Sequence, residues 1–180
     1  MDPILAANEI AAWSANSILH DGHQAFERKY DTQASVKTMQ SMMAQNGPDL
    51  EARSGSCLVL SFYTARYKLG MLTHLSRDDR LNEESVDLIK KPFSQFPALA
   101  EAPLVHLLTS PRLNKDCPDQ MADARQLIES IASRPQFEYV TVTDQNDEIS
   151  ADVLLFTKEG QLLVVDHVAD SELRFNLSTR

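Results

Sequence analysis

Apolar residues in the first 50 positions recur at helical spacing. Asp2-Pro3 provides a helix N-cap followed by proline at the first helical position, and apolar residues then share one face until Asp21-Gly22. A second apolar stripe predicts another helix, ended by Asn46-Gly47-Pro48; its members are Val36, Met39, Met42 and Met43. We therefore expect residues 1–50 to form a helical N-terminal extension packed on the same domain as the rest of the chain.

From Cys57 onward the pattern changes to that of strands. Two runs rich in apolar, β-branched and aromatic residues, Cys57–Thr64 and Leu69–Ser76, are separated by four more polar residues, which predicts a hairpin. Asn82-Glu83-Glu84 can open a helix that runs past Ile89, and Pro92 is expected to end or kink it.

The remainder alternates short strands with one helix. Leu104–Leu108 reads as a buried strand, and Asp116 or Cys117 can cap a helix with Pro118 in its first turn. Further strands are predicted at Tyr139–Thr143, Asp152–Thr157 and Leu162–Val168, the last two joined by the turn Lys158-Glu159-Gly160. Residues 51–180 are therefore expected to form one α/β domain, a layered sandwich on a mixed sheet.

Composition limits the partners that this chain can bind. A net charge of −9 over 180 residues, with scattered Lys and Arg, argues against a nucleic-acid binder. No apolar run is long enough to cross a bilayer, so we expect no membrane partner, and no basic region precedes the first apolar residues. Two cysteines make no disulfide framework, which is typical of a soluble protein folding in a reducing compartment. Export by a signal-less route stays open.

The chemistry of the chain centres on Cys57 and His74, which are 17 residues apart. Ser54-Gly55-Ser56 is a small-residue turn that delivers Cys57 to the start of an apolar strand, and the amides of Ser56 and Cys57 can form an oxyanion hole. A nucleophilic thiol needs a base beside it. The predicted hairpin brings only His74 of the five histidines next to Cys57.

The remaining candidates have simpler interpretations. His20 and His23 flank a glycine turn, His106 lies inside an apolar strand as a core histidine would, and His167 lies near the end of the last predicted strand. Cys117 is interpreted as structural. Thiol catalysis by Cys57 and His74 requires no cofactor and no metal.

The segments around Cys57 and His74 resemble a known motif. Gly55-Ser56-Cys57, an apolar strand, a polar turn and then Gly70-Met71-Leu72-Thr73-His74 is similar to the core of the chemotaxis glutamine deamidase CheD. Cytotoxic necrotizing factors and the Burkholderia lethal factor use the same Cys–His arrangement. The resemblance spans roughly residues 50–170, with specific sequence only around Cys57 and His74. It implies a CheD-like fold with a largely antiparallel sheet, Cys57 as nucleophile, His74 as base, and a protein substrate that carries the target glutamine.

The sequence departs from this family at three places. CheD has a threonine six residues before its cysteine, where this chain has Glu51; Glu51, Ser54 or a backbone carbonyl could orient His74. The glycine-rich segment after the middle strand is replaced by residues 109–112, and the closing Gly-Gly-x-x-Gly pattern is absent from residues 147–151. These departures favour a bacterial toxin or effector that deamidates a protein of another cell.

Other functions stay open at this point. The protein could deamidate a chemoreceptor in the bacterial cytoplasm, or cleave peptide or isopeptide bonds as a thiol protease with the same residues. It could also be an inactive binding module of the same fold, which a buried Cys57 would favour. In each case we expect a monomer.

Overall fold

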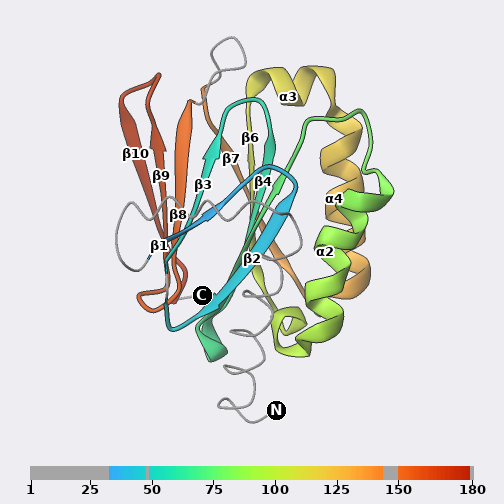
Figure 1. Ribbon diagram of the computed structural model, residues 1–180, viewed down its shortest axis with the longest axis vertical. Coiled ribbons are helices and arrows are strands. Elements are labelled where there is room, and N and C mark those ends of the chain that lie inside the picture. The colour runs from blue at the N-terminus through green and yellow to red at the C-terminus, as the bar shows by residue number, and fades with distance from the viewer. Residues whose placement is uncertain (1–32, 48, 144–149, 179–180) are drawn as a thin grey trace.

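Two five-stranded sheets pack face to face, and helices cover the outer face of one of them (Figure 1). The computed structural model describes residues 33–47, 49–143 and 150–178. The expected helix over residues 2–21 and the histidines His20 and His23 lie outside these ranges. Within them the chain is an α/β layered sandwich with mixed, largely antiparallel sheets, as the sequence predicted.

Sheet A contains five strands in the order β1-β3-β8-β9-β10. Their bounds are β1 Gln33–Val36, β3 Asp49–Ser54, β8 Ala151–Phe156, β9 Gln161–Asp166 and β10 Ser171–Asn176. Sheet B has the order β2-β5-β4-β6-β7. Its strands are β2 Gln40–Gln45, β5 Leu69–Leu75, β4 Leu58–Thr64, β6 Leu104–Thr109 and β7 Gln136–Thr141. Among the described strands, β1–β3 and β6–β7 pair in parallel, and the remaining neighbours pair antiparallel.

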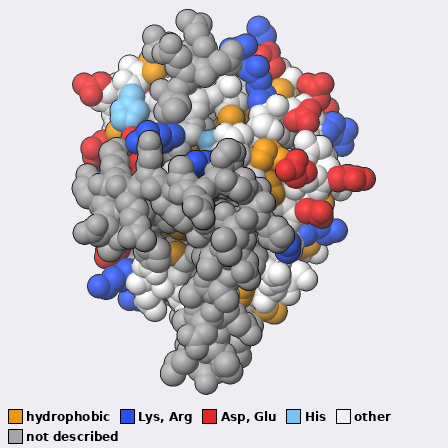
Figure 2. Space-filling model, viewed as in Figure 1, with side chains coloured by type: hydrophobic (Ala, Val, Ile, Leu, Met, Phe, Trp, Pro, Cys, Tyr) orange, Lys and Arg blue, Asp and Glu red, His pale blue; other side chains and the backbone are white. Residues whose placement is uncertain are grey.

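The helices lie on sheet B. They are α2 Glu83–Gln95, α3 Pro111–Asp116 and α4 Pro118–Ile131, with short 3₁₀ turns at Ala65–Tyr67 and Pro97–Ala100. Within the described ranges, no helix has the length and apolar character needed to cross a membrane. On the face shown in Figure 2, coloured acidic and basic side chains are interspersed.

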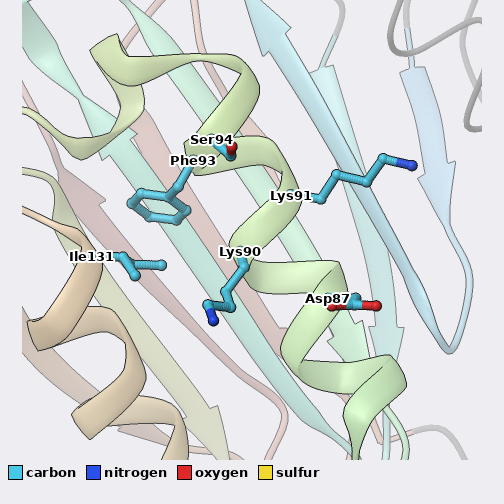
Figure 3. A pocket seen from close by; sticks show the side chains of 6 residues that line it. All are labelled: Asp87, Lys90, Lys91, Phe93, Ser94 and Ile131. Atoms are coloured by element: carbon cyan, nitrogen blue, oxygen red, sulfur yellow. The ribbon is translucent and has the colours of Figure 1, made fainter.

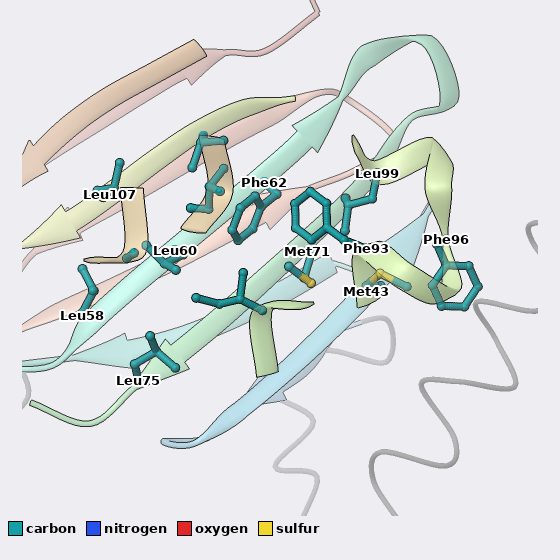
Figure 4. Close-up of a cluster of buried hydrophobic side chains, with 14 of the residues drawn as sticks. Met43, Leu58, Leu60, Phe62, Met71, Leu75, Phe93, Phe96, Leu99 and Leu107 are labelled. Atoms are coloured by element: carbon teal, nitrogen blue, oxygen red, sulfur yellow. The ribbon is translucent and has the colours of Figure 1, made fainter. Parts of the chain in front are cut away.

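Two hydrophobic cores result from this layering. The first lies between sheet B and the helices and includes Leu58, Leu60 and Phe62 of β4 and Phe93 of α2 (Figure 4). The rings of Phe62 and Phe93 meet edge to face at 5.3 Å. The second lies between the two sheets and includes Val59 and Leu72 from sheet B. Because both faces of β4 and β5 are covered, these strands carry almost unbroken apolar runs.

The predicted hairpin over residues 57–76 is confirmed. β4 and β5 pair antiparallel over seven residues, from Leu58 opposite Leu75 to Thr64 opposite Leu69. The 3₁₀ turn between them ends at Lys68, whose φ of 47° is left-handed. The hairpin therefore fixes which residues of the two strands lie side by side.

The predicted helix around residues 36–43 is wrong. This segment forms the end of β1, a turn, and β2, and it belongs to the same two sheets as the later strands rather than to a helical extension. Met42 is buried between the sheets, whereas Met43 is buried beneath the helices. A strand covered on both faces lacks the alternation that distinguishes strand from helix, and methionine favours helices, so the pattern was ambiguous.

The later elements follow the prediction with smaller differences. Asn82 caps α2 by accepting a hydrogen bond from the Ser85 amide at 2.8 Å. The helix does not end at Pro92 but continues to Gln95. Cys117 is the N-cap of α4, without a side-chain capping bond. The sequence did not predict α3 or β10.

Candidate active site

Cys57 lies where the chain crosses from sheet A to sheet B. It directly precedes β4, is half-buried, and follows the turn that leaves β3 at Ser54. The hydroxyl of Ser54 donates to the Cys57 carbonyl at 3.3 Å, and the Ser54 carbonyl accepts from the Ser150 amide at 2.9 Å. Ser54 therefore holds the turn that carries the thiol and attaches it to the start of β8.

His74 lies on β5 and faces the space between the sheets. It pairs with Val59 of β4 on one side and Gln40 of β2 on the other. Its sequence neighbour Leu75 belongs to the core beneath the helices, whereas Leu72, two residues away, belongs to the inter-sheet core. Strand alternation thus puts the imidazole on the inter-sheet face, where it is 4% exposed.

The hairpin places Cys57 and His74 diagonally across two neighbouring strands. Extending the β4–β5 register by one residue puts Cys57 opposite Ser76, with His74 opposite Val59 two positions along. Cys57, Val59 and His74 then share a face, and such diagonal neighbours are typically about 7–8 Å apart. Within the described part of the chain, His74 Nε2 has no hydrogen-bond partner. The register therefore puts Cys57 and His74 on one face of neighbouring strands, and no hydrogen bond to His74 Nε2 joins them.

A backbone carbonyl orients the imidazole. His74 Nδ1 lies 3.4 Å from the Val36 oxygen. Because a carbonyl only accepts, the proton of the neutral ring belongs on Nδ1, which leaves Nε2 as a base. Burial lowers the pKa of His74 below its usual value, and the hydrogen bond to Val36 offsets only part of this effect. At neutral pH the ring is thus uncharged and able to accept a proton.

Glu51 does not perform the role that the sequence indicated. Leu50 and Ala52 point into the inter-sheet core, so Glu51 lies on the opposite face of β3, away from His74. Its carboxylate lies 3.9 Å from the guanidinium of Arg53, and neither ring nitrogen of His74 contacts it. Of the orienting groups that the sequence left open, namely Glu51, Ser54 and a backbone carbonyl, the structure places a carbonyl, that of Val36, at the imidazole.

The turn before Cys57 can supply oxyanion donors. No hydrogen bond to another described residue uses the amide of Ser56. A backbone N–H in this position, beside the thiol, is the kind of donor that stabilises a tetrahedral oxyanion. Ser56 thus retains its predicted role as a candidate, together with the Cys57 amide.

A second group of residues, which sequence reasoning missed, fixes the end of β5. The Met39 amide donates to the His74 carbonyl at 2.6 Å. The amide and hydroxyl of Ser76 both donate to the Met39 sulfur, at 3.4 and 3.3 Å. From the helical layer, Gln120 donates to the Ser76 carbonyl at 2.8 Å. These bonds depend on pairing between distant segments, so no local sequence signal indicates them.

The structure gives His106, His167 and Cys117 surroundings that differ from those of Cys57 and His74. His106 is fully buried on β6, with Nε2 3.1 Å from a Glu138 oxygen, and His167 lies 2.9 Å from Asp152. Cys117 is buried, and burial raises the pKa of its thiol, with the charge of Asp79 adding to the effect. The nearby charge of Arg77 offsets only part of this increase, which is consistent with a structural role for Cys117.

A groove on the helical side of the molecule is separate from these residues. A groove of about 590 Å³ lies between α2 and α4 (Figure 3), lined by Asp87, Lys90, Lys91, Phe93, Ser94 and Ile131. It contains neither a thiol nor an imidazole. Among the described residues, no group of three or more His, Cys, Asp or Glu side chains is arranged to hold a metal ion.

Comparisons with known proteins leave the family of this chain open. No protein-family model matches the sequence, and no curated protein matches it. Among solved structures, a Neisseria meningitidis protein of the DUF152 family matches with a TM-score of 0.45 and 7% identity. The match covers 60% of this chain and 64% of that protein, less than two thirds of its length. DUF152 is a different family from the CheD-like deamidases, and likeness at this level carries no argument about function.

Proposed function

We propose that this protein is a thiol amidohydrolase that converts a glutamine side chain of a target protein to glutamate. The observation that carries the proposal is the placement of His74, which lies on the same face of the β4–β5 hairpin as Cys57 according to the strand register. Its Nδ1 faces the Val36 carbonyl at 3.4 Å, while Nε2 has no other partner among the described residues. This is the arrangement required of a base that activates a thiol.

In the proposed reaction, His74 Nε2 takes the proton of the Cys57 thiol. The thiolate sulfur then bonds to the side-chain carbonyl carbon of the glutamine, and the carbonyl electron pair moves to oxygen. The Ser56 and Cys57 amides stabilise this oxyanion. His74 returns its proton to the departing ammonia, leaving a thioester on Cys57. Water, deprotonated by His74, hydrolyses the thioester to glutamate and free thiol.

The burial of His74 requires that substrate binding completes the geometry. The ring is 4% exposed and its Nε2 makes no hydrogen bond in this state. Catalytic hydrogen bonds are often long or absent in free enzymes and shorten only in the substrate complex. Half-buried Cys57 is the part of the site that a substrate would reach first.

The choice of glutamine, rather than a peptide bond, rests on the resemblance of the Cys57 and His74 segments to CheD-like deamidases. A protease with the same two groups would use the same acylation chemistry. The departures at residues 109–112 and 147–151 favour a bacterial toxin or effector over a chemoreceptor deamidase. A buried Cys57 would have favoured an inactive module, and Cys57 is half-buried.

The test is an unbiased search for products. Bacterial and eukaryotic lysates are incubated with the protein or with its Cys57→Ser variant, and glutamine-to-glutamate changes are mapped by mass spectrometry. The proposal predicts one or a few sites that change only with the unaltered protein. New peptide termini in place of such sites would favour a protease.

A further inference from the structure

Among the residues that the structure describes, strand β10 forms an edge of sheet A that no other strand covers. It stands last in the order of the sheet, and its partner within this part of the chain is β9 (Figure 1). Its register with β9 is unbroken from Ser171 opposite Asp166 to Asn176 opposite Gln161, so it contains no bulge. It contains no proline, and Leu173 is 46% exposed. Proline and bulges are two of the devices that prevent an edge from pairing with another strand, and β10 has neither.

The hydrogen-bonding pattern between β9 and β10 shows which residues of β10 direct their backbone N–H and C=O groups toward this edge. The Leu177 amide donates to the Gly160 carbonyl at 2.8 Å, which extends the β9–β10 ladder by one pair. In an antiparallel ladder, alternate residues direct both backbone groups toward the same neighbouring strand. Ser171, Leu173 and Phe175 therefore bond to β9. The backbone groups of Glu172, Arg174 and Asn176 point away from it, toward the open edge.

We propose that a second copy of this chain pairs with this edge, β10 against β10 and antiparallel, with the two-fold axis at Leu173. In this register Glu172 of each copy lies opposite Arg174 of the other. Both residues direct their backbone groups to the open edge, so each such pair forms a complete hydrogen-bonded pair. The two copies of sheet A then join into one continuous sheet.

Charge favours this register over the other registers in which the same residues of β10 would form the hydrogen bonds between the two copies. Sliding one strand by two residues in either direction puts Glu172 opposite Glu172, or Arg174 opposite Arg174, at the centre of the pair. Directly opposed like charges destabilise a sheet, whereas opposed unlike charges stabilise it. In the register centred on Glu172, Arg174 of one copy would also lie opposite Asp170 of the other. Asp170, however, lies outside β10 and has a left-handed φ of 50°. The centre at Leu173 thus combines charge pairing with regular backbone.

The side chains are already positioned for this contact. Arg174 and Glu172 form an ion pair within the chain at 3.1 Å, with their side chains 65% and 55% exposed. Pairing would extend it to four alternating charges on one face of the joined sheet. On the other face, the two Leu173 side chains meet in a non-hydrogen-bonded pair, where side chains lie closest. The pairing of one short strand buries less than a standard protein interface, so we expect a concentration-dependent equilibrium between monomer and dimer.

Sedimentation equilibrium of the full chain over a wide concentration range tests the pairing. The wild-type protein should form a dimer as concentration rises, and E172R and R174E should each remain monomeric because like charges then face each other. An equimolar mixture of E172R and R174E should regain the dimer, since unlike charges again oppose in the mixed pair. R125E and E129R, which alter an exposed ion pair on α4, serve as controls with the same charge changes and should dimerise like the wild type. A wild-type protein that stays monomeric throughout, or a mixture no more dimeric than its components, overturns the proposal.

A cross-link tests the register itself. In a Cys57→Ser background, the variant L173C should form an intermolecular disulfide under mild oxidation, because opposed non-hydrogen-bonded residues fall within disulfide reach. The variant E172C is the control, since residue 172 lies opposite residue 174 of the other copy and its own counterpart lies out of reach. Equal cross-linking of the two variants, or more by E172C, contradicts pairing centred at Leu173.

Discussion

The imidazole of His74 in sheet B hydrogen-bonds the carbonyl oxygen of Val36 in sheet A, with 3.4 Å between Nδ1 and the oxygen. This contact joins the two sheets at the proposed active site. It also means that the group orienting the base is part of the backbone, so no side-chain substitution removes it directly. The conformation of β1 and its turn into β2 therefore determines the orientation of the base.

The stability of the protein should decrease as the pH falls below about 6.5, and His74 should account for part of the decrease. Burial lowers the pKa of His74 in the folded state. Between the folded and unfolded pKa values, the unfolded chain binds more protons, so acidification favours unfolding. The variant His74→Gln keeps an N–H donor for Val36 but does not titrate. Urea unfolding between pH 7.5 and pH 5 should show a smaller decrease in the free energy of unfolding for this variant than for the unaltered protein. Equal decreases for the two proteins would show that the imidazole is in contact with water in the folded state.

Cys57 should react with iodoacetamide faster than Cys117 at neutral pH. Cys117 is buried and its thiol pKa is raised, whereas Cys57 is half-buried and adjoins His74. Peptide mapping after brief labelling measures both rates in one sample. The variant His74→Gln should slow labelling of Cys57 and leave that of Cys117 unchanged. Equal rates for the two cysteines in the unaltered protein would make Cys57 a structural thiol.

Replacing Glu51 with Gln should leave turnover close to that of the unaltered protein. Glu51 lies on the face of β3 opposite the inter-sheet core and does not contact His74. Because Glu51 is only 3% exposed, we expect any effect to fall on stability. Activity per folded molecule, with His74→Gln as the inactive comparison, separates the two effects. A loss of turnover as large as that of His74→Gln would show that the carboxylate acts on the base.

Gly160→Ala should destabilise the fold by about 1–3 kcal/mol. Gly160 has a φ of 65°, and a Cβ there would collide with the Ser178 hydroxyl and approach the Tyr63 hydroxyl. Gly47 also has a positive φ, of 93°, but a Cβ there would meet nothing within 4 Å. The variant Gly47→Ala therefore measures the loss of stability caused by an alanine at a positive φ, without a steric clash. If chemical denaturation gives the same loss of unfolding free energy for both variants, the close packing around Gly160 does not contribute to the destabilisation.

The sequence predicted those parts of the molecule whose pattern depends on near neighbours. The β4–β5 hairpin combines β-rich runs with a short polar connection, and it brought Cys57 and His74 together as expected. The cap of α2 at Asn82 and the turn at Gly160 carry equally local signals. These signals sufficed for the fold class and for the pairing of β4, which follows Cys57, with β5, which carries His74.

The remaining features depend on contacts between distant segments. Val36 and Met39 reach His74 only because residues 33–45 form strands in two different sheets, whereas their apolar spacing indicated a helix. Glu51 occupies the position where CheD has a threonine, and its place on β3 turns it away from the imidazole. Strand β10 is largely exposed, and its alternation of polar and apolar residues includes only two apolar side chains, Leu173 and Phe175, so the sequence signal was too short to distinguish it from a polar tail.

The most direct test of the proposed function is glutamine-to-glutamate conversion on a purified target found in the lysate experiment. Intact-mass and peptide mass spectrometry follow the modification over time, with ammonia release measured in parallel. We predict stoichiometric conversion of one glutamine with matching ammonia by the unaltered protein, and none by Cys57→Ser or His74→Gln, with both variants folded. Conversion at an undiminished rate by folded Cys57→Ser, or cleavage of the target chain instead, would contradict the assignment.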